Sequence, residues 1–155
     1  MHILLTRNLE DSKDLIPKFK SNGFNVSNIP LLEISKINHN EIKINKFNAI
    51  IFTSSNAIKF LDLKKINKKI KCFCVGNATE KKARNFGFQN TFSAEGNVNN
   101  LKELILQNFN LSDGELLYVS GEIVSNELDK KLISEGYDVK RIVNYTVKHV
   151  ENLNE

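Results

Sequence analysis

Short β-branched runs alternate along the chain with stretches whose apolar residues recur at helical spacing. Several of the runs are apolar throughout, which is typical of parallel strands covered by helices on both faces. The sequence therefore predicts an α/β fold made of βαβ units around a parallel sheet. The runs expected to form strands are residues 3–6, 49–53, 72–75, 116–120 and 139–143. Two sets of apolar residues are each predicted to share one helical face: Leu101, Leu104, Ile105 and Phe109, and Leu128, Leu132 and Ile133.

The residues at the expected helix ends agree with this order of elements. Ser54 or Ser55 is suited to cap a helix, because a serine hydroxyl accepts a hydrogen bond from the unpaired N–H groups of the first turn. Gly23, Gly87 and Gly136 each follow a helical stretch and precede an aromatic residue. Glycine commonly ends helices at this position, so we expect three helices to stop there.

Two extended segments interrupt the alternation of strands and helices and indicate a second domain inserted into the first. Residues 29–34 contain Pro30 and follow another extended stretch with no helix between them, so we predict an edge or connecting strand. Residues 141–147 are again extended and provide a return path. We therefore expect a first domain of residues 1–34 and 146–155 and an inserted second domain of residues 35–145, an ordinary domain size.

Composition and charge exclude several classes of protein. The 22 basic and 18 acidic residues give a formal net charge of +4, spread along 155 residues, whereas nucleic-acid-binding proteins usually carry a concentrated basic patch. No stretch approaches the roughly 20 apolar residues that span a bilayer, and the amino terminus lacks the features of a secretory leader. We therefore expect a cytoplasmic protein with neither nucleic acid nor membrane as a partner.

The residue types that often hold metals are not arranged for that purpose. Cys72 and Cys74 lie two apart in an apolar run, so on a strand they share one face. Their spacing matches neither a zinc site nor a redox motif, and we expect two buried reduced thiols. His2, His39 and His149 are scattered through terminal or loop-like sequence. We assign the histidines no role and expect no metal site.

Two other α/β classes lack their signature residues here. A receiver-like domain needs an acidic cluster after its first strand and an acceptor aspartate after a central strand, where this chain has Thr6-Arg7 and Thr53-Ser54. A nucleotide-binding domain needs a glycine-rich phosphate loop, and the sequence contains neither a Gly-X-Gly-X-X-Gly nor a Gly-Lys-Ser/Thr motif. Both classes are therefore disfavoured.

Short motifs in a fixed order resemble those of the uroporphyrinogen-III synthase family. The motifs are Leu4-Leu5-Thr6-Arg7, Phe52-Thr53-Ser54-Ser55-Asn56-Ala57-Ile58, Val75-Gly76-Asn77-Ala78-Thr79, Ala94-Glu95-Gly96, Ser120-Gly121-Glu122 and Val143-Asn144-Tyr145-Thr146. The chain departs from the family pattern in four ways: Asn8 replaces a proline, Glu80 an alanine and Ser120 a basic residue, and the last motif has one intervening residue.

The resemblance implies two βαβ domains, the second inserted in the first, and an activity that needs no cofactor. The family cyclises hydroxymethylbilane, a linear tetrapyrrole, with inversion of the last pyrrole ring and loss of water, a step of heme biosynthesis. Family members are longer, because their first domain continues after the return strand. We therefore expect a truncated uroporphyrinogen-III synthase. The alternative is a non-catalytic anion-binding or interaction module of the same fold, or an inactive fragment.

Three strand-to-helix turns are predicted to bind the carboxylates of that substrate. N–H groups at helix N-termini bind anions, and open α/β sheets bind ligands at the carboxyl ends of their strands. The alternative for each turn is that its residues only cap a helix. The substrate-binding residues expected in these turns are Thr53, Ser54, Ser55, Asn56, Gly76, Thr79, Ser120 and Gly121.

Two further residues are expected to complete the site. Arg7, after the first strand, is predicted to pair with a substrate carboxylate, with a surface or interdomain ion pair as the alternative. The family has a tyrosine on the return strand, and Tyr145 is the match for a catalytic residue that donates a proton to the departing hydroxyl. A structural tyrosine at a hinge is its alternative. The implied partner is the tetrapyrrole alone, and the protein is expected to be a monomer or a swapped dimer.

Overall fold

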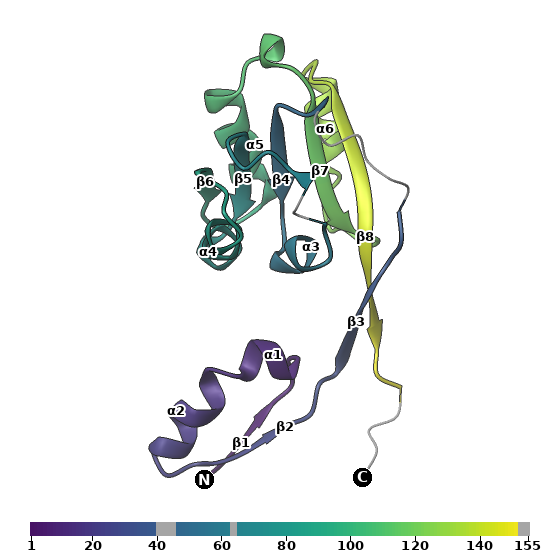
Figure 1. The fold of residues 1–155 in the computed structure, drawn as a ribbon. Helices are drawn as coiled ribbons and strands as arrows, with labels where there is room; N and C mark the ends of the chain where they lie inside the picture. The colour runs from purple at the N-terminus through teal and green to yellow at the C-terminus, as the bar shows by residue number, and fades with distance from the viewer. Residues whose placement is uncertain (40–45, 63–64, 152–155) are drawn as a thin grey trace. The chain divides into compact units, whose positions relative to one another are not determined.

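The chain divides into two compact units. A computed structural model describes residues 1–39, 46–62 and 65–151 (Figure 1). Unit 1 consists of Met1–Ser35 and Val147–Glu155, and unit 2 consists of Lys36–Thr146. Each unit is a separate cluster of contacts.

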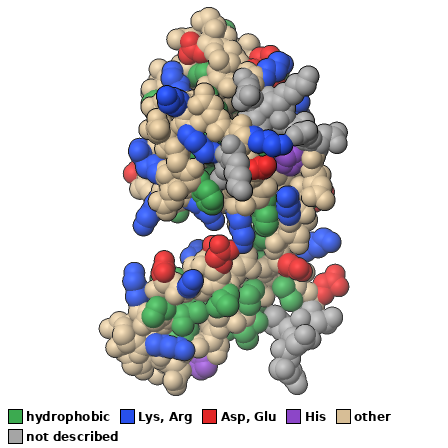
Figure 2. Space-filling view, viewed as in Figure 1, with side chains coloured by type: hydrophobic (Ala, Val, Ile, Leu, Met, Phe, Trp, Pro, Cys, Tyr) green, Lys and Arg blue, Asp and Glu red, His purple; other side chains and the backbone are tan. Residues whose placement is uncertain are grey.

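Unit 1 contains a two-stranded parallel sheet and two short helices. Strand β1 (His2–Leu5) pairs in parallel with β2 (Asn25–Asn28), and α1 (Leu9–Ser12) and α2 (Leu15–Ser21) connect them. Gly23 follows α2 with a φ of 79°, a conformation that side chains with a Cβ rarely adopt. Hydrophobic side chains also lie on the surface of this unit (Figure 2), where Leu4 and Leu9 are exposed.

Unit 2 is built on a six-stranded sheet. Its strands are β3 (Leu32–Lys36), β4 (Ala49–Phe52), β5 (Lys71–Val75), β6 (Asn90–Ala94), β7 (Leu116–Gly121) and β8 (Val139–His149). They lie in the order β3-β8-β7-β4-β5-β6, and the pairs from β8 to β6 are all parallel. The chain therefore moves outward from β4 to β5 and β6, and then returns to the other side of β4 to form β7 and β8. Strands β3 and β8 each extend across the boundary of unit 2.

Helices cover both faces of this sheet, as continuously apolar strands require. They are α3 (Ser55–Lys59), α4 (Asn77–Asn85), α5 (Val98–Asn108) and α6 (Leu128–Ser134), with a 3-10 turn at Leu111–Asp113. Alternate strand residues, including Ile51, Phe73 and Tyr118, point toward α5 and α6 and form one buried cluster with them. The residues between them point toward α3 and α4, where the rings of Phe52 and Phe88 meet edge to face at 5.9 Å.

Most of the expected elements are confirmed. All five predicted strands form, and β8 joins the run at 139–143 and the return segment at 141–147 into one strand. Strand β3 lies at the sheet edge and overlaps the predicted edge segment. Ser54 is the N-cap of α3, and its hydroxyl accepts a hydrogen bond from Asn56 N–H at 3.2 Å. Gly87 and Gly136 follow their helices with φ of 100° and 95°.

Three expectations about local structure are wrong or incomplete. Ile133 was expected on the buried face of α6 but is 52% exposed, because it lies one residue, or about 100°, beyond Leu132 around the helix. Strand β6 was not predicted, since its polar residues suit a sheet edge and give no apolar run. Residues Ser120, Gly121 and Glu122 do not form a strand-to-helix turn, because β7 continues through Gly121 and α6 begins only at Leu128.

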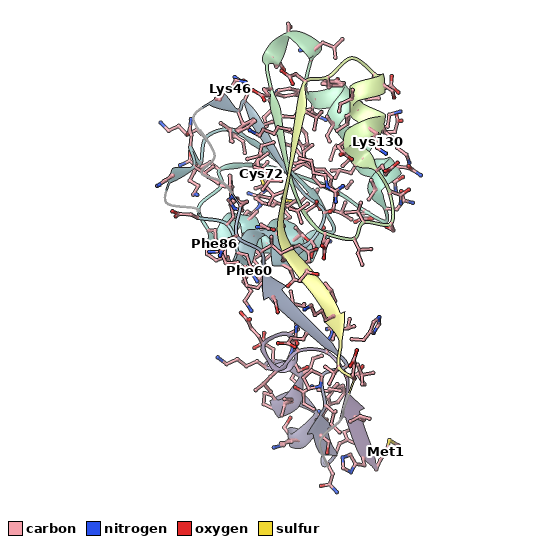
Figure 3. The ribbon with its side chains drawn as sticks, turned by 90° about the vertical axis from the view of Figure 1, so that its right-hand side faces the viewer. Met1, Lys46, Phe60, Cys72, Phe86 and Lys130 are labelled. Carbon is pink, nitrogen blue, oxygen red and sulfur yellow. The ribbon has the colours of Figure 1, made fainter. Side chains whose placement is uncertain are left out.

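The two cysteines are buried and free, as expected. Cys72 and Cys74 lie on the same face of β5 with their Sγ atoms 3.8 Å apart, and Figure 3 shows Cys72 within the sheet of unit 2. The neighbouring thiol and burial raise the pKa of Cys72 far above its ordinary value, so the thiol is a packing group and no nucleophile.

Within 1–39, 46–62 and 65–151, no helix combines the length and the apolar character needed to span a membrane. In the same ranges, no three His, Cys, Asp or Glu side chains gather as a metal site would require.

Adjacent residues of α6 test the packing of unit 2. Leu132→Ala should lower the free energy of unfolding by about 2–5 kcal/mol, because Leu132 is fully buried and its loss leaves a cavity. The matched change Ile133→Ala should alter it by less than about 0.5 kcal/mol, because Ile133 faces solvent. Urea denaturation measures both values, and equal losses would contradict the assignment of the buried face.

Candidate functional site

A cavity opens at the edge of unit 2 where the parallel strands end. Its volume is about 330 Å³. The wall comes from the segments that follow β4, β6 and β7, from the first residue of α5, and from one residue each of β5, β7 and β8. The lining residues are Thr53, Ser54, Val75, Gly96, Asn97, Val98, Tyr118, Ile123, Val124, Ser125, Asn126 and Tyr145. The cavity is thus a product of sheet topology, which brings distant segments to one edge.

Thr53 and Tyr118 lie where the order of the strands reverses. Thr53 follows the last residue of β4, and Tyr118 lies on β7, the strand that pairs with the opposite side of β4 from β5. Their hydroxyl oxygens are 3.2 Å apart and hydrogen-bonded. Open parallel sheets bind ligands in the crevice at such a switch point, because the loops on its two sides run in opposite directions. This pair therefore marks the position where a ligand is expected.

Tyr118 is held on several sides. Its side chain is 1% exposed and belongs to the cluster under α5 and α6. The Arg141 guanidinium lies 5.9 Å from the centre of its ring, within the range of a cation–π interaction. Burial raises the pKa of the Tyr118 phenol above its ordinary value, while the Thr53 bond and Arg141 act in the opposite direction. The phenol therefore stays protonated at neutral pH.

A β-bulge in β8 positions Tyr145. Ser120 of β7 pairs with Val143, but the next residue, Gly121, pairs with Tyr145. Asn144 is the extra residue. It is fully buried, and its Nδ2 donates to the carbonyl of Ala57 at 2.7 Å. A bulge leaves one residue out of the ladder and redirects the side chain that follows. Here it places the Tyr145 ring at the cavity wall.

The Tyr145 ring packs directly over the backbone of Gly121. A Cβ at position 121 would lie 2.7 Å from Tyr145 Cζ and 3.0 Å from its hydroxyl oxygen. On another side the ring lies 6.5 Å from that of Phe60, which Figure 3 shows beside β8. Gly121 therefore serves the site by its lack of a side chain.

Arg141 donates hydrogen bonds to three oxygen atoms at the end of β7, beside the bulge. Its Nε donates to Ser120 Oγ at 2.8 Å, and its terminal nitrogen donates to the carbonyls of Gly121 at 3.0 Å and Glu122 at 3.3 Å. Ser120 is 1% exposed. The hydroxyl of Ser120 and the carbonyl of Gly121 are therefore engaged inside the protein, and their predicted contact with substrate stays a prediction.

The other predicted binding residues are distributed around the same edge. Thr53 and Ser54 line the cavity, and Ser55 and Asn56 follow them in the first turn of α3. Gly76 is the N-cap of α4 with a φ of 77°. Thr79 is 6% exposed, and neither it nor Gly76 is part of the cavity wall. The structure thus brings Thr53, Ser54 and Tyr145 to one cavity and leaves the others beside it or away from it.

Arg7 belongs to unit 1. It follows β1, and its backbone carbonyl accepts a hydrogen bond from Asn28 Nδ2 at 2.8 Å. The side chain of Asn28 therefore fixes the backbone at Arg7. The predicted pairing of the Arg7 side chain with substrate stays a prediction.

Sequence reasoning missed much of the cavity wall. Asn97 caps α5 through its Oδ1, which accepts from the N–H groups of Asn99 at 2.8 Å and Asn100 at 3.2 Å. Its position after Gly96 was a usable signal, since a glycine followed by a capping residue marks a strand-to-helix turn. Tyr118 also gave a signal, because a tyrosine in an otherwise apolar strand needs a partner for its hydroxyl. No comparable signal marks residues 123–126.

The wall of the cavity carries polar but uncharged groups. Among the lining residues that the structure describes, none is Asp, Glu, Lys, Arg or His. Its polar side chains are hydroxyls and amides, and Val75, Val98, Ile123 and Val124 provide apolar surface between them. On the face in Figure 2, Lys and Arg side chains are spread over the surface of each unit instead of gathering in one patch. The cavity is therefore suited to hydrogen-bond an anion without a paired cation.

Replacing Gly121 tests how Tyr145 is positioned. Gly121→Ala should displace the Tyr145 ring, because the new Cβ would lie far closer to Cζ than the roughly 3.5–4.0 Å of a normal carbon contact. Ser120→Ala is the matched control, since it adds no bulk next to the ring. Crystal structures of both variants provide the measurement. An undisplaced ring in Gly121→Ala would refute this account of the bulge.

This chain matches one protein-family model and several solved structures. A family model described as uroporphyrinogen-III synthase HemD matches residues 13–155. The uroporphyrinogen-III synthetase of Helicobacter pylori is 25% identical with a TM-score of 0.62, and the match covers 82% of this chain and 58% of that one. A mutant uroporphyrinogen III synthase of Thermus thermophilus is 14% identical with a TM-score of 0.60. That match covers 97% of this chain and 64% of the other.

The search of curated proteins finds no match. The match spans less than two thirds of the length of either solved relative. The family model, in contrast, covers nearly the whole of this chain, including every residue of the cavity wall. The chain belongs to the uroporphyrinogen-III synthase family.

Proposed function

We propose that this protein acts as a uroporphyrinogen-III synthase, closing hydroxymethylbilane with inversion of the last pyrrole ring and loss of water. The observation that carries the proposal is the uncharged, donor-rich cavity at the switch point of the sheet. Family membership supplies the reaction. The cavity supplies a place where such a substrate is held.

The reaction mainly requires control of substrate shape. Loss of the hydroxyl leaves a reactive cation-like azafulvene that also closes unassisted, but without inverting the last ring. The enzyme therefore has to favour one folded conformation, and orientation of this kind lowers barriers by several kcal/mol. Closure with loss of water is neither an oxidation nor a reduction, so the proposed mechanism needs no redox cofactor, and we propose no metal, as the resemblance to the family implies.

Neutral donors suit a substrate that carries carboxylates on all its rings. A hydrogen bond to a charged group contributes roughly 1.5–3 kcal/mol, and several such bonds fix a shape without the tight hold of buried ion pairs. Ligand cavities commonly measure about 300–1,000 Å³. At about 330 Å³, this cavity lies at the lower end of that range and takes only part of a tetrapyrrole. We assign it to one end of the substrate.

Tyr145 is the proposed proton donor. It is a cavity-wall residue, and the bulge and Gly121 fix its ring. The phenol gives its proton to the departing hydroxyl, which leaves as water, and the phenolate regains a proton from the pyrrole carbon that loses one when the ring closes. Arg7 is proposed to pair with a substrate carboxylate, and Thr53, Ser54, Ser55, Asn56, Gly76 and Thr79 to contribute donors from the turns. We also propose that units 1 and 2 correspond to the two domains of the family, in a cytoplasmic protein.

The product ratio tests the activity. Incubated with hydroxymethylbilane, the protein should raise the ratio of type III to type I uroporphyrinogen above that of the unassisted reaction. Chromatography of the oxidised products measures the ratio. A ratio equal to that without protein would reject the proposed activity. Binding without a changed ratio would instead assign the chain to anion binding alone.

The same assay tests Tyr145. Tyr145→Phe should lower the rate of type III formation severalfold, because the ring stays packed over Gly121 while the proton donor is lost. The melting temperature should stay close to that of the unmodified protein. Tyr137→Phe is the matched control, since the Tyr137 hydroxyl donates to the carbonyl of Phe109 and is not part of the cavity wall. An unaltered rate in Tyr145→Phe would remove this residue from the mechanism.

A further inference from the structure

The cavity wall contains a second phenol, Tyr118, whose hydroxyl is bonded to a residue that also lines the cavity. Tyr118 is 1% exposed, whereas its partner Thr53 is half-buried. Both belong to the cavity wall, and their oxygens are 3.2 Å apart. Thr53 is therefore the member of the pair that is more open to a bound ligand.

The chemistry of the two hydroxyls sets the direction of their hydrogen bond. A phenol is a stronger acid than an aliphatic alcohol, so its proton is the better donor and its oxygen the poorer acceptor. Burial, which favours the protonated phenol, keeps that proton in place. Tyr118 therefore donates to Thr53 Oγ1. The Thr53 hydroxyl can then donate its own proton to another group. Because its oxygen already accepts a hydrogen bond, this hydroxyl is a stronger donor.

Residues of both neighbouring strands hold the Tyr118 ring in place. The ring of Tyr118 lies in the core cluster with Ile51, its register partner on β4. Arg141, its register partner on β8, lies over the ring. A ring held in this way cannot swing out to meet a ligand, so its effect reaches the cavity through Thr53.

We propose that Tyr118 is a positioning residue: it donates to Thr53 and so aims the Thr53 hydroxyl at a carboxylate oxygen of the bound tetrapyrrole. This inference rests on the proposed function, because it takes the ligand class from it. The donor of the ligand contact is Thr53, and Tyr118 sets the direction and strength of that donor. The two residues therefore act as one unit at the switch point of the sheet.

A double-mutant cycle on ligand affinity tests the proposal. The probe is uroporphyrin III, a stable tetrapyrrole with the same carboxylate side chains, and its fluorescence on titration gives Kd. Thr53→Val should raise Kd about tenfold or more, the loss expected for a hydrogen bond to a charged group. Tyr118→Phe should raise it about threefold to tenfold. In the Thr53→Val background, Tyr118→Phe should have no effect beyond about twofold, because no hydroxyl remains for it to aim.

Two controls separate positioning from structural damage. Thr53→Ser keeps the hydroxyl and should restore the sensitivity to Tyr118→Phe. Tyr137→Phe removes another phenol bond of unit 2 and should leave Kd unchanged. An equal effect of Tyr118→Phe in both Thr53 backgrounds, or no effect in either, would overturn this inference while the proposed function stands. Failure of the unmodified protein to bind uroporphyrin III would also overturn this inference, whereas the product ratio alone decides the proposed function.

Discussion

The order of the strands in unit 2 is the constraint from which the site follows. Because β7 returns to the opposite side of β4 from β5, the segments after β4 and β7 leave the sheet on either side of one crevice. Parallel pairing then brings the segments after β5 and β6 to the same edge. The backbone topology thus brings the segments of the wall together, and side-chain contacts then position the individual residues.

The second determinant is the irregularity at the end of β7. A regular ladder would pair Gly121 with Asn144, but the bulge buries Asn144 against Ala57 and gives Tyr145 the place over Gly121. Arg141 donates hydrogen bonds to Ser120 Oγ and to the carbonyl of Gly121 beside the bulge, and it also lies over the ring of Tyr118. One arginine outside the cavity wall thus contacts the ring of Tyr118 and bonds to Gly121, over which Tyr145 packs. Its guanidinium donates to carbonyls of the protein backbone and is not part of the cavity wall, whose described residues carry no charge.

The sequence could predict the elements and their order, because local patterns determine them. Apolar runs gave the central strands, and Ser54, Gly87 and Gly136 marked helix ends by their own conformational preferences. The site was only partly predictable. The role of Thr53 in the site could be predicted from its place after a central strand. Its hydrogen bond with Tyr118 could not, because that bond depends on the strand order. The burial of Ser120 and the place of Tyr145 depend on a bulge, and nothing in the local sequence marks a bulge at this position.

A crystal structure of the protein with uroporphyrin III tests most directly whether neutral donors at this edge hold the tetrapyrrole. The account predicts that part of the ligand occupies the cavity, with a carboxylate oxygen within hydrogen-bonding distance of Thr53 Oγ1 and the rings beside Tyr145. A ligand held by lysine and arginine side chains elsewhere on the surface, with this cavity empty, would contradict it.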